Sequence, residues 1–153
     1  MEYKFVDIGT SYFCTSIDEF GLDVHGILVE PVEEYLNLIP SSPTIIKANY
    51  AISDSNRIDK MFIPISETPL RYISEKEIIE KELSISGRDG CSSLGRPHPD
   101  EQTNYRTVEC SVITLDELCK KYDITSIEYL KIDTEGHDHI ILRQVFNMIM
   151  CGK

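Results

Sequence analysis

The chain has 153 residues, of which 41% are hydrophobic, and its 26 acidic and 15 basic residues give a net charge of −11. This length fits one domain with a substantial core, and the composition excludes a disordered or fibrous protein. No apolar run approaches the roughly 18 residues of a membrane span, and the negative charge argues against a nucleic-acid partner, since phosphate binding needs a basic face.

The N-terminus and the cysteines predict a cytoplasmic protein. The first ten residues, MEYKFVDIGT, have neither the basic region nor the apolar stretch of a secretion signal. The five cysteines are odd in number and show no C-x-x-C spacing, so neither a zinc site nor a disulfide framework is expected. We predict free thiols in a reducing compartment, acting as small buried apolar side chains.

The N-terminal third alternates between predicted strands and helices. Apolar runs predict strands at residues 3–8, 27–29 and 44–52. One helix is expected within residues 10–20, and a second begins at Pro31, whose missing N–H costs nothing at a first helical position. This β-α-β-α-β order is typical of a parallel sheet with crossover helices.

The middle of the chain, residues 54–105, departs from this rhythm and is interpreted as an insertion in the α/β core. A strand is predicted at 61–65, where Pro64 indicates a sheet edge. A capping-box pattern predicts a helix at 74–83. Residues 84–104 are rich in Gly, Ser, Pro and charge and predict a long loop, whose glycines would allow it to act as a lid.

Regular patterning returns in the last third. Residues 106–113 alternate as a strand, and Thr114 begins a helix with Glu117 three positions later, a second capping box. Another apolar strand is predicted at 127–132 and a helix at 138–150. The apolar residues of that last helix recur at helical spacing: Ile141, Leu142, Val145, Phe146 and Ile149.

The segment VDIGTS, residues 6–11, is the first candidate binding turn. A glycine directly after a buried strand lets the backbone approach a ligand, and the following helix start offers free N–H groups. Ligands of doubly wound sheets bind at the carboxyl ends of strands, so Asp7, Gly9, Thr10 and Ser11 are candidate binding residues. A turn without a ligand would show the same pattern, and the full G-x-G-x-x-G motif is absent.

Glu30 ends the second predicted strand, 23 residues after Asp7. An acidic residue about 20 positions beyond such a turn can accept hydrogen bonds from both hydroxyls of an adenosine ribose. The alternative is an acidic residue that only favours the start of a helix. The spacing from Asp7 and Gly9 favours a nucleoside ligand.

Reactive side chains are concentrated in KIDTEGHD, residues 131–138. Burial of like charges raises carboxylate pKa values and can create a general base from Asp133 or Glu135, and His137 could take up a proton near neutral pH. Either carboxylate could instead be a helix cap. The H-D-H pattern at 137–139 predicts no metal site, because no further His or Cys cluster completes four ligands.

These motifs resemble the FkbM-type methyltransferases, which use S-adenosyl-L-methionine. Four segments match in the family's order and roughly its spacing: FVDIGTS, GILVEPVEEYLNLI, IIKANYAISD and SVITLDELCKKYDITSIEYLKIDTEGHD. The most specific pieces are Glu30-Pro31 and LKIDTEG at 130–136. The resemblance implies a class I methyltransferase fold over residues 1–153, which is a three-layer, doubly wound, mostly parallel, Rossmann-like α/β sheet with an insertion after the third strand.

The resemblance also implies roles for individual residues. The cofactor-binding set would be Asp7, Gly9, Thr10, Ser11, Glu30, Pro31, Asn49, Ser53 and Asp54. Asp7 and Gly9 would border the methionine end, Glu30 would hold the ribose, and residues 49–54 would approach the adenine. Asp133 and Glu135 would face the methyl group and its acceptor, and His137 would be the base that deprotonates a hydroxyl. The family's acceptors, hydroxyls of sugars or small natural products, suit an acidic protein without a nucleic-acid or membrane partner.

Two departures from the family keep other functions open. Phe13 stands where the family usually has a glycine, and we count four core strands where class I methyltransferases have seven. The last strands are therefore expected to be missing. The chain would then be a fragment, a naturally shortened protein, or a protein whose missing sheet edge is supplied by another copy in a homo-oligomer. One alternative is an inactive methyltransferase-like remnant that binds a ligand or a protein. An oxidoreductase with an unusual nucleotide loop is another, although the absent G-x-G-x-x-G argues against it.

Overall fold

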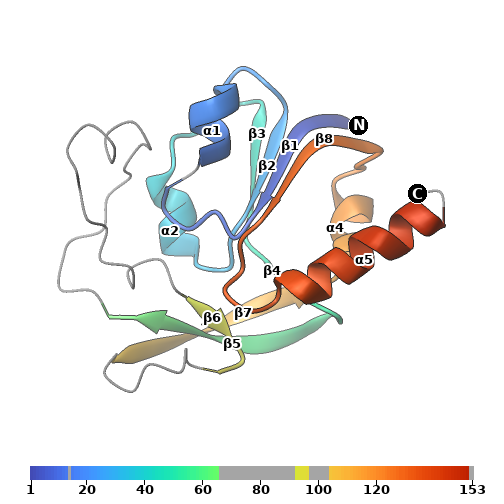
Figure 1. Cartoon of the computed structure of the whole chain (residues 1–153). Coiled ribbons are helices and arrows are strands. Elements are labelled where there is room, and N and C mark those ends of the chain that lie inside the picture. The colour runs from blue at the N-terminus through green and yellow to red at the C-terminus, as the bar shows by residue number, and fades with distance from the viewer. Residues whose placement is uncertain (14, 66–91, 97–103, 152–153) are drawn as a thin grey trace.

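The computed structural model describes residues 1–13, 15–65, 92–96 and 104–151, which form two four-stranded sheets with helices around them (Figure 1). The helix predicted at 74–83 lies outside the described residues, and so does most of the loop predicted at 84–104. Within the described ranges, no helix is long and apolar enough to cross a membrane.

The first sheet is parallel, with the strand order β3-β2-β1-β8. Its strands are β1 (Glu2–Ile8), β2 (Gly26–Val29), β3 (Ile45–Ala48) and β8 (Ser126–Ile132). The helices around it are α1 (Thr15–Phe20), α2 (Glu33–Leu38), α4 (Leu115–Lys121) and α5 (Asp138–Met150). The predicted α/β class and its parallel sheet are confirmed.

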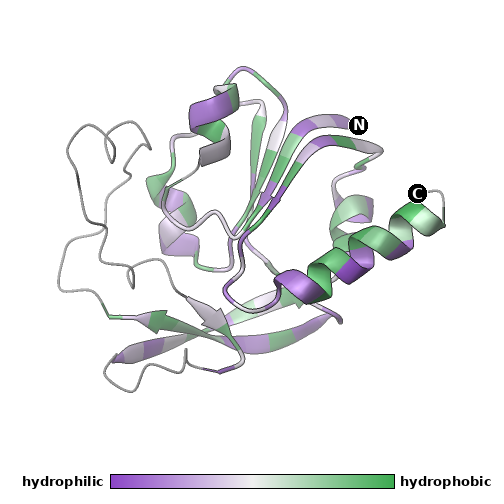
Figure 2. Cartoon of the chain, in the orientation of Figure 1, coloured by the Kyte–Doolittle hydropathy of each residue, from purple (hydrophilic) through white to green (hydrophobic). Residues whose placement is uncertain are grey.

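Helices cover both faces of this sheet and produce three layers (Figure 1). On one face, Phe5 of β1 packs in a cluster with Ile17 of α1 and Leu36 of α2. On the other face, the strands pack against Leu118 of α4 and Ile141 of α5. Figure 2 shows hydrophobic residues along the strands between these helical layers. Burial on both faces explains why β2 is a continuous apolar run in the sequence, since all four of its residues are buried.

The helix predicted to begin at Pro31 begins two residues later. Val32 is extended, with φ −91° and ψ 101°, and its N–H donates to Glu30 Oε1 at 2.9 Å. This bond holds the backbone out of the helical conformation until Glu33. The predicted acidic first turn, Glu33 and Glu34, is confirmed.

The strand predicted at 44–52 is wrong as a single element. β3 ends at Ala48, and β4 (Ala51–Ile52) pairs in the second sheet. Asn49 Nδ2 donates to the carbonyl oxygens of Glu30 and Pro31, each at 3.0 Å, and the Tyr50 N–H donates to the Ala48 oxygen at 3.0 Å. These bonds turn the chain away from the parallel sheet.

The second sheet has the order β4-β7-β5-β6. Its remaining strands are β5 (Arg57–Pro64), β6 (Ser93–Leu94) and β7 (Tyr105–Ile113). β5 begins four residues before the predicted strand. Met61 and Phe62 pair with β6 on one side and with β7 on the other, whereas Pro64 pairs with β7 alone, so the predicted sheet edge is present only after Phe62. β6 is a short strand inside the predicted loop. The interpreted insertion therefore contributes two paired strands to the fold.

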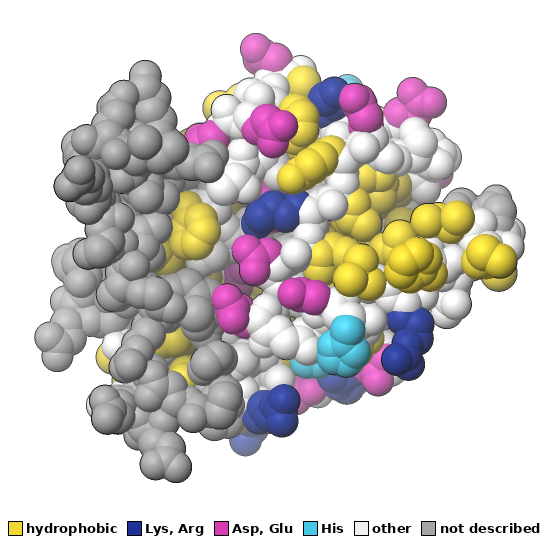
Figure 3. All heavy atoms as spheres, viewed as in Figure 1, with side chains coloured by type: hydrophobic (Ala, Val, Ile, Leu, Met, Phe, Trp, Pro, Cys, Tyr) yellow, Lys and Arg dark blue, Asp and Glu magenta, His cyan; other side chains and the backbone are white. Residues whose placement is uncertain are grey.

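Both C-terminal helices begin where the sequence predicts, and α5 also ends there. Thr114 Oγ1 accepts the Glu117 N–H at 3.1 Å, which confirms that cap, while the Thr114 N–H goes to the Asn56 side chain. In α5 only Ile141 is buried. Leu142 and Phe146 are 45% and 65% exposed, and Figure 3 shows hydrophobic side chains gathered along this helix.

Candidate functional site

The carboxyl ends of the four parallel strands are aligned. Ile8 pairs with Val29 on one side and Ile132 on the other, and Val29 pairs with Ala48. The next residues along the chain therefore lie at one edge of the sheet: Gly9, Glu30, Asn49 and Asp133. This edge faces the second sheet and borders a cavity of about 40 Å³. The predicted residues among its lining are Gly9, Ser11, Glu30, Pro31, Asp133, Glu135 and His137.

Gly9 is where the β1 and β8 loops come closest. Its φ is +85°, and a Cβ at this position would lie 1.9 Å from the Asp133 carbonyl oxygen. Only glycine combines this backbone conformation with so close an approach. Gly9 therefore allows the β1 and β8 loops to pack closely together, in addition to any role in letting a ligand approach the backbone.

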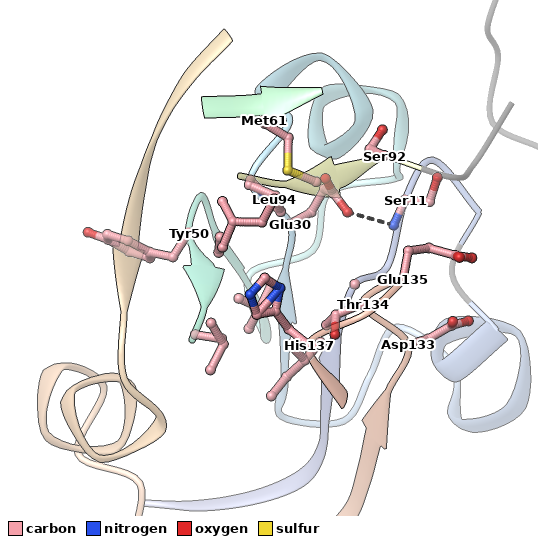
Figure 4. A pocket seen from close by; sticks show the side chains of 16 residues that line it. Ser11, Glu30, Tyr50, Met61, Ser92, Leu94, Asp133, Thr134, Glu135 and His137 are labelled. Carbon is pink, nitrogen blue, oxygen red and sulfur yellow. Dashed lines mark hydrogen bonds between the residues drawn. The ribbon is translucent and has the colours of Figure 1, made fainter. Parts of the chain in front are cut away.

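Glu30 is a buried carboxylate on the cavity wall, with 4% of its surface exposed. One of its oxygens accepts the Ser11 N–H at 3.0 Å (Figure 4), and the other accepts the Val32 N–H at 2.9 Å. Burial raises the pKa of Glu30 to about 7, against the lowering effect of the two N–H donors. The group therefore exchanges between its neutral and ionised forms near neutral pH.

The loop after β8 carries four polar side chains to the cavity, those of Asp133, Thr134, Glu135 and His137. Glu135 adopts a φ of 49°, and Gly136 a φ of 124°, so the chain makes a tight turn between strand and helix. Asp138 Oδ1 accepts the N–H of Thr134 at 2.7 Å and its hydroxyl at 2.6 Å, which fixes this turn. Asp133, with 57% of its side chain exposed, remains open to solvent.

His137 extends its imidazole into the cavity, opposite the Glu30 side chain (Figure 4). Burial lowers the pKa of His137, and the nearby Arg57 charge lowers it further. The neutral imidazole is thus favoured at pH 7, and its free nitrogen can accept a proton.

Comparison with known proteins identifies the family. The model of the methyltransferase FkbM domain matches residues 6–149. The chain belongs to the FkbM methyltransferase family. Searches of curated proteins and of solved structures gave no match. The match includes both halves of the cavity, from the β1 loop to the loop before α5, so the site described above is the candidate active site of a methyltransferase.

Two predicted binding residues of the FkbM domain lie beside the cavity rather than in its lining. Asp7 is fully buried, and its carboxylate accepts hydrogen bonds from Ser16 Oγ at 2.7 Å and Lys131 Nζ at 3.2 Å. Thr10 is also fully buried, and its hydroxyl donates to the Ser11 carbonyl at 3.3 Å. Their contacts position the β1 loop, and direct contact with a ligand stays a prediction.

The adenine-side prediction named polar residues, whereas the cavity wall there is mostly apolar. Asn49 holds the turn after β3, and the Ser53 hydroxyl donates to the exposed Asp54, which also pairs with Arg57. None of the three predicted residues is in the lining. The lining residues outside the named site set are Ile8, Val29, Tyr50, Ala51, Ile52, Met61, Ser92, Leu94 and Thr134, of which residues 50–52 belong to the segment 49–54 that was predicted to approach the adenine. Met61, Ser92 and Leu94 come from the interpreted insertion, which no strand-end pattern marked as part of the site.

Phe13 packs away from the cavity lining. Its ring contacts that of Tyr12 edge to face, with centroids 5.2 Å apart, and Tyr12 in turn contacts Tyr35. Phe13 therefore packs on the aromatic pair that joins the β1 loop to α2, outside the cavity lining. The described cysteines, Cys110, Cys119 and Cys151, are free thiols, and the described residues contain no metal-binding cluster of His, Cys, Asp and Glu.

Proposed function

We propose that this FkbM domain is an S-adenosyl-L-methionine-dependent O-methyltransferase that methylates a hydroxyl of a sugar or another small molecule. One observation carries the proposal. A buried carboxylate suited to a ribose and a neutral imidazole suited to deprotonating a hydroxyl border the same small cavity, in a chain of a methyltransferase family.

The donors and acceptors around the cavity fit the cofactor. Each carboxylate oxygen of Glu30 accepts one backbone N–H and retains a lone pair for a ribose hydroxyl. Gly9 lets a ligand approach the backbone closely. Ile52, Met61 and Leu94 supply an apolar wall of the kind that a purine ring requires.

The cavity volume sets a condition on binding. Ligand pockets enclose about 300–1,000 Å³, well above the 40 Å³ of this cavity. Binding of a nucleoside therefore requires the β1 loop around Ser11 and the β6 strand to separate. Among the residues that the structure describes, the buried Ser11 hydroxyl has no hydrogen-bond partner, so a ligand that opens this loop could supply one.

The proposed chemistry is an in-line displacement. S-adenosyl-L-methionine would supply an electrophilic methyl group on a sulfonium, with the carbon–sulfur bond breaking as the hydroxyl oxygen takes the methyl group and S-adenosylhomocysteine leaving. His137 accepts the proton of the acceptor hydroxyl, a contribution of about 10²–10⁴-fold. Holding both reactants in line contributes roughly 7–11 kcal/mol in favourable cases. Asp133 and Glu135 border the solvent side of the cavity and offer hydrogen-bond acceptors to neighbouring hydroxyls.

Calorimetric titration of S-adenosyl-L-methionine and S-adenosylhomocysteine tests the proposal. We expect micromolar binding to the unaltered chain and its loss in Glu30→Ala. Glu33→Ala, which removes an exposed carboxylate only three positions away, is the matched control and should bind normally. A folded chain that binds neither compound would contradict the proposal.

A further inference from the structure

Two serine hydroxyls on the cavity wall are buried without a hydrogen-bond partner among the described residues. They belong to Ser11, in the β1 loop, and to Ser92, directly before β6 (Figure 4). Each residue is 7% exposed, and both line the cavity together with Glu30. Ser92 lies close enough to Tyr35 to lower the pKa of that phenol, but it does not reach hydrogen-bond geometry there. Because a buried hydroxyl without a partner is unfavourable, both groups indicate a molecule bound in the cavity.

The alternation of side chains along β6 separates Ser92 from the neighbouring Ser93. Successive side chains of a strand point to opposite faces. Leu94, which pairs with Met61 of β5, lines the cavity, and so does Ser92 two positions before it. Ser93 is outside the lining, and its hydroxyl donates to the Arg96 carbonyl oxygen at 2.6 Å. Of these two buried serines, Ser92 is therefore the one whose hydroxyl is available to the cavity.

The hydrogen-bond capacities around Glu30 match those of a vicinal diol. One carboxylate oxygen accepts the Ser11 N–H at 3.0 Å, the other accepts the Val32 N–H at 2.9 Å, and each can accept one bond more. The two hydroxyls of a ribose would donate to these oxygens. The oxygen of each ribose hydroxyl can then accept a hydrogen bond in turn, which a serine hydroxyl can donate. Ser11 and Ser92 are the two donors that this arrangement requires.

We propose that Ser92 is a specificity-determining residue of the cofactor site, which donates a hydrogen bond to one ribose hydroxyl while Ser11 donates to the other. The inference rests on the proposed function, because it assigns the diol to the ribose of S-adenosyl-L-methionine. It gives the second sheet a polar contact with the ligand, in addition to the apolar wall of Met61 and Leu94. Water is the competing occupant, since a cavity of about 40 Å³ has room for it.

Binding of S-adenosylhomocysteine and of its 2′-deoxy and 3′-deoxy analogues to Ser92→Ala tests the contact. We expect this variant to bind S-adenosylhomocysteine about fivefold more weakly than the unaltered chain does, which corresponds to the loss of one hydrogen bond. The difference should vanish for the analogue that lacks the contacted hydroxyl and persist for the other analogue. Ser11→Ala should show the reverse preference between the two analogues. Ser93→Ala is the matched control and should bind all three compounds as the unaltered chain does.

Urea denaturation without ligand gives a readout that does not depend on the cofactor. Removal of a buried hydroxyl that lacks a partner relieves a desolvation cost, so Ser92→Ala should keep or raise the denaturation midpoint. Ser93→Ala, which loses its hydrogen bond to Arg96, should lower the midpoint. A lowered midpoint in Ser92→Ala, with no dependence of binding on either ribose hydroxyl, would assign the Ser92 hydroxyl to bound water and overturn the proposal.

The binding data separate this inference from the proposed function. If the unaltered chain binds S-adenosylhomocysteine and Ser92→Ala binds it equally well, the inference alone is overturned. An equal loss in Ser92→Ala for all three compounds also overturns it, because the serine would then act through packing. If the unaltered chain binds none of the three compounds, the proposed function fails and the role of Ser92 fails with it.

Discussion

The two halves of the candidate site differ in how their carboxylates meet water. Asp7 and Glu30 are 0% and 4% exposed, at the ends of strands that have neighbours on both sides. The Asp133 side chain is 57% exposed, after β8, which ends the parallel sheet. A buried acid that is held in place by hydrogen bonds suits recognition of one fixed ligand, whereas an open loop suits exchange of acceptors and protons. We therefore expect changes in the first half to affect binding and stability, and changes in the second half to affect turnover.

The largest effect should come from Gly9→Ala, which damages the contact between the two halves. A Cβ at 1.9 Å from the Asp133 oxygen forces the loops apart, and we expect a loss of about 4 kcal/mol or more in the free energy of unfolding, with no cofactor binding. Gly21→Ala is the control. Its φ of +82° is equally strained, but no atom lies within 4 Å, so urea denaturation should show a loss of only about 1–2 kcal/mol. Equal losses would show that the close approach at Gly9 is unimportant.

His137→Gln tests the exposed half. Loss of the base should slow methyl transfer about 10²–10⁴-fold while leaving the affinity for S-adenosylhomocysteine within about twofold. Transfer of a radiolabelled methyl group to a panel of sugars and polyols measures the first quantity, and calorimetry the second. His139→Gln changes an exposed histidine outside the cavity lining and should retain full turnover. If both variants keep normal turnover, His137 is not the base.

Glu30→Gln tests the buried half through pH. The pKa of Glu30 in the folded protein, about 7, is above its ordinary value of 4.5, so ionisation in the folded state is disfavoured. This group therefore lowers stability as pH rises from 4.5 through 7, by about 3 kcal/mol in total. Relative to the unaltered chain, Glu30→Gln should gain about this amount in unfolding free energy between pH 5 and pH 8. A difference that does not vary with pH would contradict the raised pKa.

The smallest effect is expected from Glu135→Gly. Glu135 has a φ of 49°, so glycine relieves strain in the folded chain but adds freedom to the unfolded one. Thermal denaturation should show that the free energy of unfolding changes by no more than about 1 kcal/mol. Asp123→Gly, at a φ of 50° outside the cavity lining, is the matched control for the backbone effect. A loss of stability several times larger in Glu135→Gly would show that the carboxylate holds the loop.

The same contrast explains what the sequence could predict. Apolar runs identified β1, β2 and β8, although no residue of β8 is fully buried, and the residues after these strands identified Gly9, Glu30 and Asp133. The turn at Asn49 could not be predicted, because it depends on bonds to the carbonyls of Glu30 and Pro31, distant in sequence.

The apolar side of the cavity was missed for a similar reason. Met61, Ser92 and Leu94 reach it through β5 and β6, whose pairing joins residues about 30 positions apart. Short strands of this kind carry weak local patterns, and their place at the site depends on long-range pairing. The Lys131 ion pair was equally invisible, since a lysine in an apolar strand gives no sign of its partner across the sheet.

A crystal structure of the chain with S-adenosylhomocysteine tests the central claim most directly. The account predicts the ribose hydroxyls within about 3.2 Å of the Glu30 carboxylate, the β1 loop and β6 moved apart, and the sulfur on the side of Asp133 and His137. A ligand bound elsewhere, with Glu30 still closed against Ser11, would contradict it.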